Sequence, residues 1–420
     1  MTNFKIAQFI RHLTHIILAL SLAGCSQRID DTETQGSDIS VNQAPVKNNT
    51  IVLNTTQTED VRSYQHGIDF VPLADGNYYL TWASSGNPPT GAQPNGSWPH
   101  DIYYAKINPK NPVITPITLI ANPEAQEPVS TAITSDGHIM ITMEDGWHTD
   151  NQVAQRYGVY NSDFSPVLAY PHMAFDGGHS GHVAAVDNRF VMFYCDDWVE
   201  GGGVDNLGSG NDVKAHIYSA TGVLESRLNI AVGDTTRDWW PLVAGSKTRA
   251  ALVWQRYVDN QTYSDLMVSI VDVKSKKTIL KPLKIESAIK YYTYSVTYLP
   301  SIERFLILGA YHTGGGFAYL LDQDGNIMSS NKVLPAIIRE SQSIAWEQPD
   351  TVKVIQPTAP SGLMVLSMTA STITLKNPIA DDYQWHYSGT DGIFIDANTV
   401  YIVSTSPSGL VEKTFHISDL

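Results

Sequence analysis

Beyond residue 62 the chain alternates apolar and polar positions in short runs that are separated by turn residues. Runs such as Tyr78–Ala83 and Phe190–Tyr194 are rich in aromatic and β-branched side chains, and Gly, Pro, Asn or Asp follow most of them. No long segment has the 3.6-residue period of an amphipathic helix. This pattern predicts an all-β fold.

The same unit recurs seven times: a polar or aromatic start, an apolar strand, a turn and a second apolar strand. Its starts are anchored at His66, Glu127, His182, Trp240, Tyr294, Ser343 and Thr390, with 47 to 61 residues between neighbouring anchors. Further hairpins, such as Lys214–Leu224 and Phe317–Met328, lie between these units. Four strands per roughly fifty residues, seven times, predict a seven-bladed β-propeller, a single domain over residues 62–420.

Two details of this fold prediction stay open. A pair of β-sandwiches or a parallel β-helix would also consist of many short strands. In a propeller, we expect Ile51–Thr56 to complete the last blade beside Lys413–Leu420.

The first 25 residues have the order of a secretory signal. Lys5 and Arg11 precede an apolar stretch, Ile16–Cys25, that is too short to span a bilayer. The residues Leu22–Cys25 resemble the lipobox of bacterial lipoproteins, which implies a signal peptide over residues 1–24 and a lipid on Cys25. With Ser26 next, the resemblance implies the outer membrane, with membrane contact through the lipid only; an ordinary signal peptide is the alternative.

The residues that follow are polar and indicate a flexible tether over residues 25–61. The formal net charge is −15 and there is no basic run, which argues against a nucleic-acid partner. If Cys25 carries lipid, Cys195 is the only remaining thiol, and the mature chain has no intramolecular disulfide. We expect a monomer that is stabilised by burial.

Polar and aromatic residues recur where the predicted inner strands begin and end. Equivalent strand ends of successive blades collect around the axis of a propeller, so these residues are expected to share one face. The residues expected there are His66, His148, His179, His182, Trp198, Arg237, Asp238, Trp240, Arg256, Tyr294 and His312. Polar groups between aromatic walls suit a sugar-binding groove, although the same residues could serve packing and backbone hydrogen bonding alone.

No cofactor is required by this interpretation, and a structural zinc or calcium ion is an open alternative. His179, His182 and Cys195 carry zinc-type donors, but their spacing matches no zinc template. The Gly-rich loop with Asp205, Asn206 and Asp212 lacks the spacing of a calcium loop. The sequence has no dinucleotide, phosphate-loop or nucleophile-elbow motif.

Four stretches, "HGIDF", "GGHSGHVAAV", "RDWWPLVAG" and "VWQRY", carry a resemblance to the seven-bladed propeller polysaccharide lyases that act on ulvan. Ulvan is a sulfated polymer of rhamnose and uronic acid. The resemblance implies β-elimination beside a uronate carboxylate, with an acidic polysaccharide as the partner. Such a reaction needs a cation to neutralise the carboxylate, a base at C5 and an acid at the leaving oxygen.

The resemblance also implies roles for individual residues. It suggests His182 or His179 as base or acid with His148 in reach, Tyr294 or Tyr298 as their partner, Arg256 as the carboxylate clamp, and His66, Trp198, Arg237, Asp238 and Trp240 in substrate binding. Two positions depart from the family pattern: Cys195 stands where a second histidine is expected, and Trp239–Trp240 stands where a tyrosine is expected. A non-catalytic glycan-binding propeller and an envelope lipoprotein scaffold are therefore the rival hypotheses.

Overall fold

The computed structural model describes residues 49–51, 65–84, 100–122, 125–145, 153–196, 212–233, 236–385, 389–406 and 409–417. Two compact units divide the chain, Met1–Asn42 and Gln43–Leu420, and every described residue belongs to the second unit. The predicted signal peptide and Cys25 lie outside the described residues. Strands and turns make up the described part of the chain, which contains no helix that could cross a membrane. The prediction of an all-β chain is confirmed.

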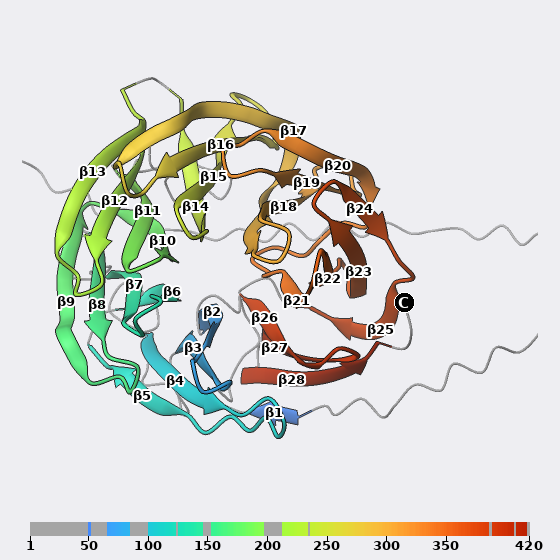
Figure 1. The fold of residues 1–420 in the computed structure, drawn as a ribbon, viewed down its shortest axis with the longest axis horizontal. Coiled ribbons are helices and arrows are strands. Elements are labelled where there is room, and N and C mark those ends of the chain that lie inside the picture. Colours follow the sequence, from blue (N-terminus) through green and yellow to red (C-terminus); the bar gives the residue numbers. More distant parts are fainter. Residues whose placement is uncertain are drawn as a thin grey trace, which may run out of the picture. The chain divides into compact units, whose positions relative to one another are not determined.

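Antiparallel strands follow one another in chain order within the sheets, except that β1 pairs with β28 and β25 with β23 (Figure 1). The first sheet consists of β2 (Gln65–Pro72), β3 (Tyr78–Ser84), β4 (Asp101–Ile107) and β5 (Ile117–Ile120). The second consists of β6 (Glu127–Ile133), β7 (Ile139–Asp145), β8 (Ala154–Tyr160) and β9 (Pro166–Asp176). The third consists of β10 (His179–Val186), β11 (Arg189–Asp196), β12 (Asp212–Ser219) and β13 (Leu224–Ala231).

A seven-stranded sheet follows, in which one long strand serves two groups of four. Its strands are β14 (Asp238–Gly245), β15 (Arg249–Tyr257), β16 (Ser264–Asp272), β17 (Lys277–Leu299), β18 (Arg304–Tyr311), β19 (Gly316–Leu321) and β20 (Ile327–Leu334). The first half of β17, up to Ile289, pairs with β16, and the second half, from Ile289 onward, pairs with β18. Strand β17 therefore ends one four-stranded group and begins the next.

The last two sheets complete the ring of strands. One consists of β21 (Ile344–Gln348), β22 (Thr351–Pro357), β23 (Ser361–Thr369), β24 (Thr372–Leu375) and β25 (Ile379–Gln384), where β25 also pairs with β23. The other consists of β26 (Thr390–Asp396), β27 (Thr399–Ser406), β28 (Gly409–His416) and β1 (Asn49–Ile51). The strands nearest the centre in Figure 1 are β2, β6, β10, β14, β21 and β26.

Strand β1 joins the two ends of this second unit. Asn49 lies opposite Glu412 and Ile51 opposite Leu410 in the ladder with β28. A closing strand was predicted at Ile51–Thr56, so only Ile51 is shared, and residues 52–64 lie outside the described residues. Ladder hydrogen bonds come from the backbone, which is why the polar residues Asn49 and Thr50 can form an edge strand that hydropathy does not reveal.

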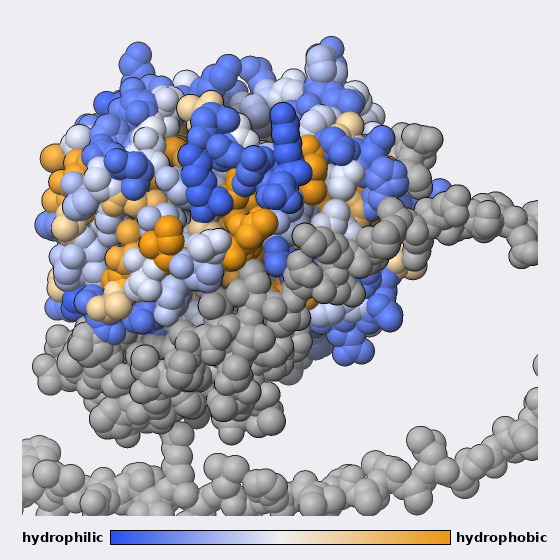
Figure 2. Space-filling view, turned by 90° about the horizontal axis from the view of Figure 1, so that it is seen from below, coloured by the Kyte–Doolittle hydropathy of each residue, from blue (hydrophilic) through white to orange (hydrophobic). Residues whose placement is uncertain are grey.

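Neighbouring sheets pack against each other through fully buried aromatic and aliphatic side chains. The ring of Phe193 on β11 meets that of Trp254 on β15 edge-on, with centroids 5.8 Å apart, and both side chains are inaccessible to solvent. Along the rim, Figure 2 shows hydrophobic residues in small patches among hydrophilic ones. The core therefore lies between sheets, and one edge of each innermost strand faces the central axis.

The starts of the inner strands share a backbone irregularity. Register shifts interrupt the ladders at the heads of β2, β6, β10 and β14 and in the middle of β17. Positive φ occurs at or just before six of the inner strand starts, at Gly67, Ser180, Trp240, Tyr292, Glu340 and Gly389. A bulge of this kind re-aims side chains, and strained backbone of this kind clusters at functional sites. A functional site is therefore expected at this end of the sheets.

Candidate functional site

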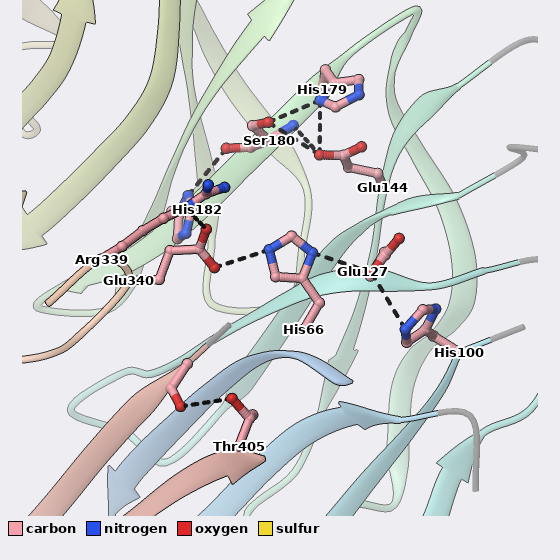
Figure 3. Close-up of polar contacts among 11 residues, drawn as sticks. His66, His100, Glu127, Glu144, His179, Ser180, His182, Arg339, Glu340 and Thr405 are labelled. Atoms are coloured by element: carbon pink, nitrogen blue, oxygen red, sulfur yellow. Dashed lines mark hydrogen bonds and ion pairs between the residues drawn. The ribbon is translucent and has the colours of Figure 1, made fainter. Parts of the chain in front are cut away.

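His66, at the head of β2, lies between two carboxylates near the axis (Figure 3). Its Nδ1 is 3.1 Å from Glu127 Oε2, and its Nε2 is 3.0 Å from Glu340 Oε2. Burial alone lowers the pKa of His66, but the charges and hydrogen bonds of Glu340 and Glu127 outweigh it and raise the pKa to about 9. Both ring nitrogens therefore donate, and His66 is an imidazolium at neutral pH.

Trp240 touches three of the rings around this ion pair. It stacks on His66 with centroids 5.9 Å apart and planes 14° apart. It also meets His182 edge-on at 5.6 Å and Tyr292 edge-on at 5.4 Å. The Trp240 side chain is buried, so it holds these rings in place rather than lying open to solvent.

His182 is neutral at neutral pH, whereas His66 is charged. Burial lowers the pKa of His182 to about 4, and the Ser180 and Pro241 carbonyl groups offset this only in part. Its Nδ1 lies 3.1 Å from the Ser180 carbonyl oxygen, which can only accept. A proton on Nδ1 satisfies the Ser180 carbonyl group and leaves a lone pair on Nε2.

A cation completes the group on the side of the last sheets. Arg339 Nε donates to Glu340 Oε1 at 2.7 Å, and its guanidinium lies 4.1 Å from the centroid of the Tyr292 ring. The Arg339 side chain is 20% exposed, against 6% for Glu340, so the guanidinium is the more accessible partner. We call His66, His182, Trp240, Tyr292, Glu127, Arg339 and Glu340 the axial cluster.

His179 belongs to a separate group of contacts beside this cluster. Its Nδ1 lies 2.8 Å from both Glu144 Oε1 and Ser180 Oγ, and its ring packs on Trp239 with centroids 4.6 Å apart. Cys195 pairs with His179 across the strands, and burial raises the pKa of its thiol well above the usual value. The residues that the structure describes contain no group of three potential metal ligands.

Arg256 and Tyr294 are both engaged with the protein itself. Arg256 forms a two-point ion pair with Asp238, through Nε to Oδ1 at 2.7 Å and Nη2 to Oδ2 at 2.6 Å. Tyr294 is buried, and its hydroxyl donates to the Trp240 carbonyl group and accepts from the backbone N–H of Gln255 at 3.0 Å. Neither residue can therefore meet a ligand without giving up these contacts.

The other predicted site residues are spread over both ends of the sheets. Tyr298 packs against Phe305 near the turn that joins β17 to β18, at the end opposite the axial cluster. Arg237 is partly exposed beside the axial cluster and makes no ion pair among the described residues. His312 is exposed, 3.3 Å from Thr262 Oγ1 through its Nε2. His148, Trp198, Asp205 and Asn206 lie outside the described residues.

A central cavity of about 310 Å³ lies between the inner strands and is bordered by His182. Two carboxyl groups from neighbouring sheets line it, Asp69 on β2 and Asp391 on β26. Burial raises the pKa of Asp69 to about 7 and that of Asp391 to about 8. The cavity therefore changes charge across neutral pH.

Sequence reasoning did not include Glu340, Arg339 and Tyr292 among the site residues. Glu340 precedes the Ser343 anchor by three residues, and Tyr292 precedes the Tyr294 anchor by two. Both occupy the positive-φ position that Trp240 occupies in its own repeat. The repeats in the sequence contain this information, because anchors placed two or three residues earlier would coincide with Tyr292 and Glu340.

No protein-family model matches the sequence, and no curated protein matches it. Among solved structures, the WD40 domain of Toxoplasma gondii coronin has 7% identity and a TM-score of 0.51, over 89% of this chain and 87% of that chain. The BP39L lectin from Burkholderia pseudomallei has 11% identity and a TM-score of 0.53, over 85% and 98%. Polysaccharide lyase Uly1 has 9% identity and a TM-score of 0.50, over 87% and 92%. These likenesses confirm a β-propeller fold and extend no further than the fold.

Proposed function

We propose that this protein is a glycan-active propeller that cleaves a uronic-acid-containing, ulvan-like polysaccharide by β-elimination at the axial cluster. The observation that carries the proposal is the pair of imidazoles against Trp240, one charged and one neutral. The pKa of His66 is raised to about 9 and that of His182 is lowered to about 4. Neighbouring groups whose environments drive their pKa values apart are typical of acid–base sites.

In this proposal His182 is the base. Its Nε2 lone pair takes the C5 proton of the uronate, electrons move to form the C4–C5 double bond, and the glycosidic oxygen at C4 leaves. Arg339 neutralises the substrate carboxylate, which makes the C5 proton more acidic. The Tyr292 hydroxyl group, which lies 3.1 Å from that of Tyr257, donates its proton to the leaving oxygen.

These assignments move two roles away from the residues that the family resemblance implied. Arg256 would have to give up its two-point ion pair with Asp238 before it could hold a substrate. Tyr294 would have to give up hydrogen bonds in a site without solvent access. Arg339 and Tyr292 supply the cation and the hydroxyl group from within the axial cluster. Arg339 is 20% exposed and Arg256 is 21% exposed, so position and not exposure distinguishes them.

The engagement of Arg256 and Tyr294 also favours a second candidate function, glycan binding without cleavage. In that case the end of the sheets that carries the axial cluster would bind the polysaccharide, and no double bond would form in the sugar. The hypothesis of an envelope scaffold has no comparable observation behind it.

The test is ultraviolet absorbance of unsaturated uronate with purified protein and a panel of uronic-acid polysaccharides that includes ulvan. We expect a rise on one polymer that is lost in His182→Asn and kept in His138→Asn, which changes a histidine at the far end of the sheets. A flat trace with every polymer, together with polysaccharide binding, would overturn cleavage in favour of binding alone.

The remaining features of the proposal concern architecture and location. If the two halves of the seven-stranded sheet count as separate blades, the unit has seven blades. We propose a monomer that is held at the outer membrane by a lipid on Cys25 and needs no cofactor for the reaction. Mass spectrometry of the mature N-terminus tests the lipid directly.

A further inference from the structure

A second group of side chains lies beside the axial cluster on the same end of the sheets, and the acid–base chemistry does not use it. Arg237 immediately precedes β14, and Tyr257 ends β15. Asp238 lies opposite Arg256 in the antiparallel pair, so Arg237 lies opposite Tyr257. The Tyr257 N–H donates to the Arg237 carbonyl oxygen at 2.9 Å. Side chains that are directly opposite in an antiparallel pair share a face.

The two arginines at this strand end therefore have different surroundings. Successive side chains of a strand point to opposite faces, so Arg256 and Asp238 share one face while Arg237 and Tyr257 share the other. Arg256 is neutralised by Asp238 at 2.6 Å and 2.7 Å. Arg237, partly exposed, has no carboxylate partner among the described residues. A guanidinium without a counter-ion can pair two-point with an anionic ligand group.

Aromatic rings extend the face that carries Arg237. Tyr257 lies 5.3 Å from Tyr291, centroid to centroid, and both rings are partly exposed. Their hydroxyl groups are held in place, that of Tyr257 by Tyr292 at 3.1 Å and that of Tyr291 by the Gln261 carbonyl oxygen at 3.1 Å. Partly exposed rings that are fixed at their polar ends suit the apolar face of a sugar ring.

We propose that Arg237, Tyr257 and Tyr291 form a subsite for one anionic sugar residue, next to the residue that is bound at the axial cluster. This inference rests on the proposed function for the class of ligand. The guanidinium of Arg237 takes the carboxylate or sulfate group, and the tyrosine rings lie under the sugar. Tyr257 connects the subsite to the axial cluster through its hydrogen bond with Tyr292.

The test compares binding by isothermal titration in the His182→Asn background, which prevents turnover. The probes are oligosaccharides of ulvan, oligogalacturonate as the carboxylate-only probe, and a carrageenan oligosaccharide as the sulfate-only probe. We expect Arg237→Ala to weaken binding of the ulvan probe about tenfold or more. If Arg237→Ala loses affinity for the carboxylate-only probe, the subsite binds a uronate. If it loses affinity for the sulfate-only probe, the subsite binds a sulfated sugar.

Matched variants separate the subsite from general damage. Arg227, on β13, is exposed and makes no ion pair among the described residues, so Arg227→Ala should bind as the parent does. Tyr291→Ala should weaken binding, whereas Tyr291→Phe, which keeps the ring, should not.

Binding of all probes by Arg237→Ala at the parent affinity, or no binding of any probe by the parent, would overturn the subsite. Failure of the proposed function has a different signature. If wild-type protein yields no unsaturated product but Arg237→Ala still weakens binding, cleavage is wrong and the subsite stands.

Discussion

The two ends of the sheets differ in how far apart in sequence their contacting residues are. At the axial end, His66 meets Glu127, 61 residues on, and Glu340, 274 residues on. At the far end, turns are closed within two to four residues, as where Asp75 accepts from the Asn77 N–H and Asp322 from the Asn326 side chain. Turns of neighbouring sheets also meet at the far end, as Ser135 meets Asp187, 52 residues on, but each turn is closed by its own residues. The contacts of His66 at the axial end form only when sheets from both ends of the unit come together. The proposed site lies at the end whose contacts reach furthest along the chain.

The largest expected effect is on catalysis. His182→Asn keeps a polar side chain of similar size but removes the basic nitrogen, so we expect cleavage to fall by about 10²–10⁴-fold. The measurement is the initial rate of absorbance change on the preferred polysaccharide. A rate within a factor of about two of wild type would show that His182 is not the base.

The next effect is on stability at the axial end. His66→Ala leaves the Glu127 and Glu340 carboxylates without the cation between them, and breaking a buried ion pair costs about 3–5 kcal/mol in the free energy of unfolding. Urea denaturation at pH 7 measures it. An unfolding free energy within about 1 kcal/mol of wild type would show that the ion pairs of His66 with Glu127 and Glu340 do not stabilise the fold.

A third prediction concerns pH. The folded pKa of Asp69 is raised from 3.8 to about 7, so the folded state holds a proton that the unfolded state has lost. The stability that this proton provides is complete below pH 3.8 and is lost as the pH rises through about 7. Asp69→Asn removes this loss, and we expect a gain in the free energy of unfolding, relative to wild type, that is larger at pH 8 than at pH 5. An equal difference at both pH values would contradict the raised pKa.

The smallest effect is expected at the far end. His138 contacts Asp136 at 3.0 Å in a partly exposed turn, two residues away. Because exposed ion pairs contribute little, His138→Ala should lower the free energy of unfolding by no more than about 1 kcal/mol. A loss as large as that of His66→Ala would remove the contrast between the two ends.

This contrast also explains what could be predicted from the sequence. The turn at Asp322–Asn326, with Gly325 at φ 88°, is encoded by adjacent residues, and the Asp-Gly pair predicts it. The alternating runs and their recurrence predict the all-β ring for the same reason. Local signals were sufficient for the strands and turns.

The site could be predicted only in part, because its partners are distant in sequence. The histidines His66 and His182 follow from their place at repeat starts, but nothing near Arg256 indicates that Asp238 would neutralise it across the strand pair. Likewise, the position of Tyr294 in its repeat does not reveal that its hydroxyl is buried against Trp240. Whether a polar side chain is free or engaged depends on strand register, which the sequence pattern does not determine to the residue.

The central claim is that, of the two imidazoles beside Trp240, His66 is held charged and His182 is held neutral. The most direct measurement is a titration of the histidine ring signals by NMR in histidine-labelled protein, assigned with His66→Phe and His182→Asn. We predict that the pKa of His66 is about 9 and that of His182 about 4. Titration of both rings together near pH 6.5 would contradict the account, because the carboxylates would then not hold His66 charged and burial would not hold His182 neutral.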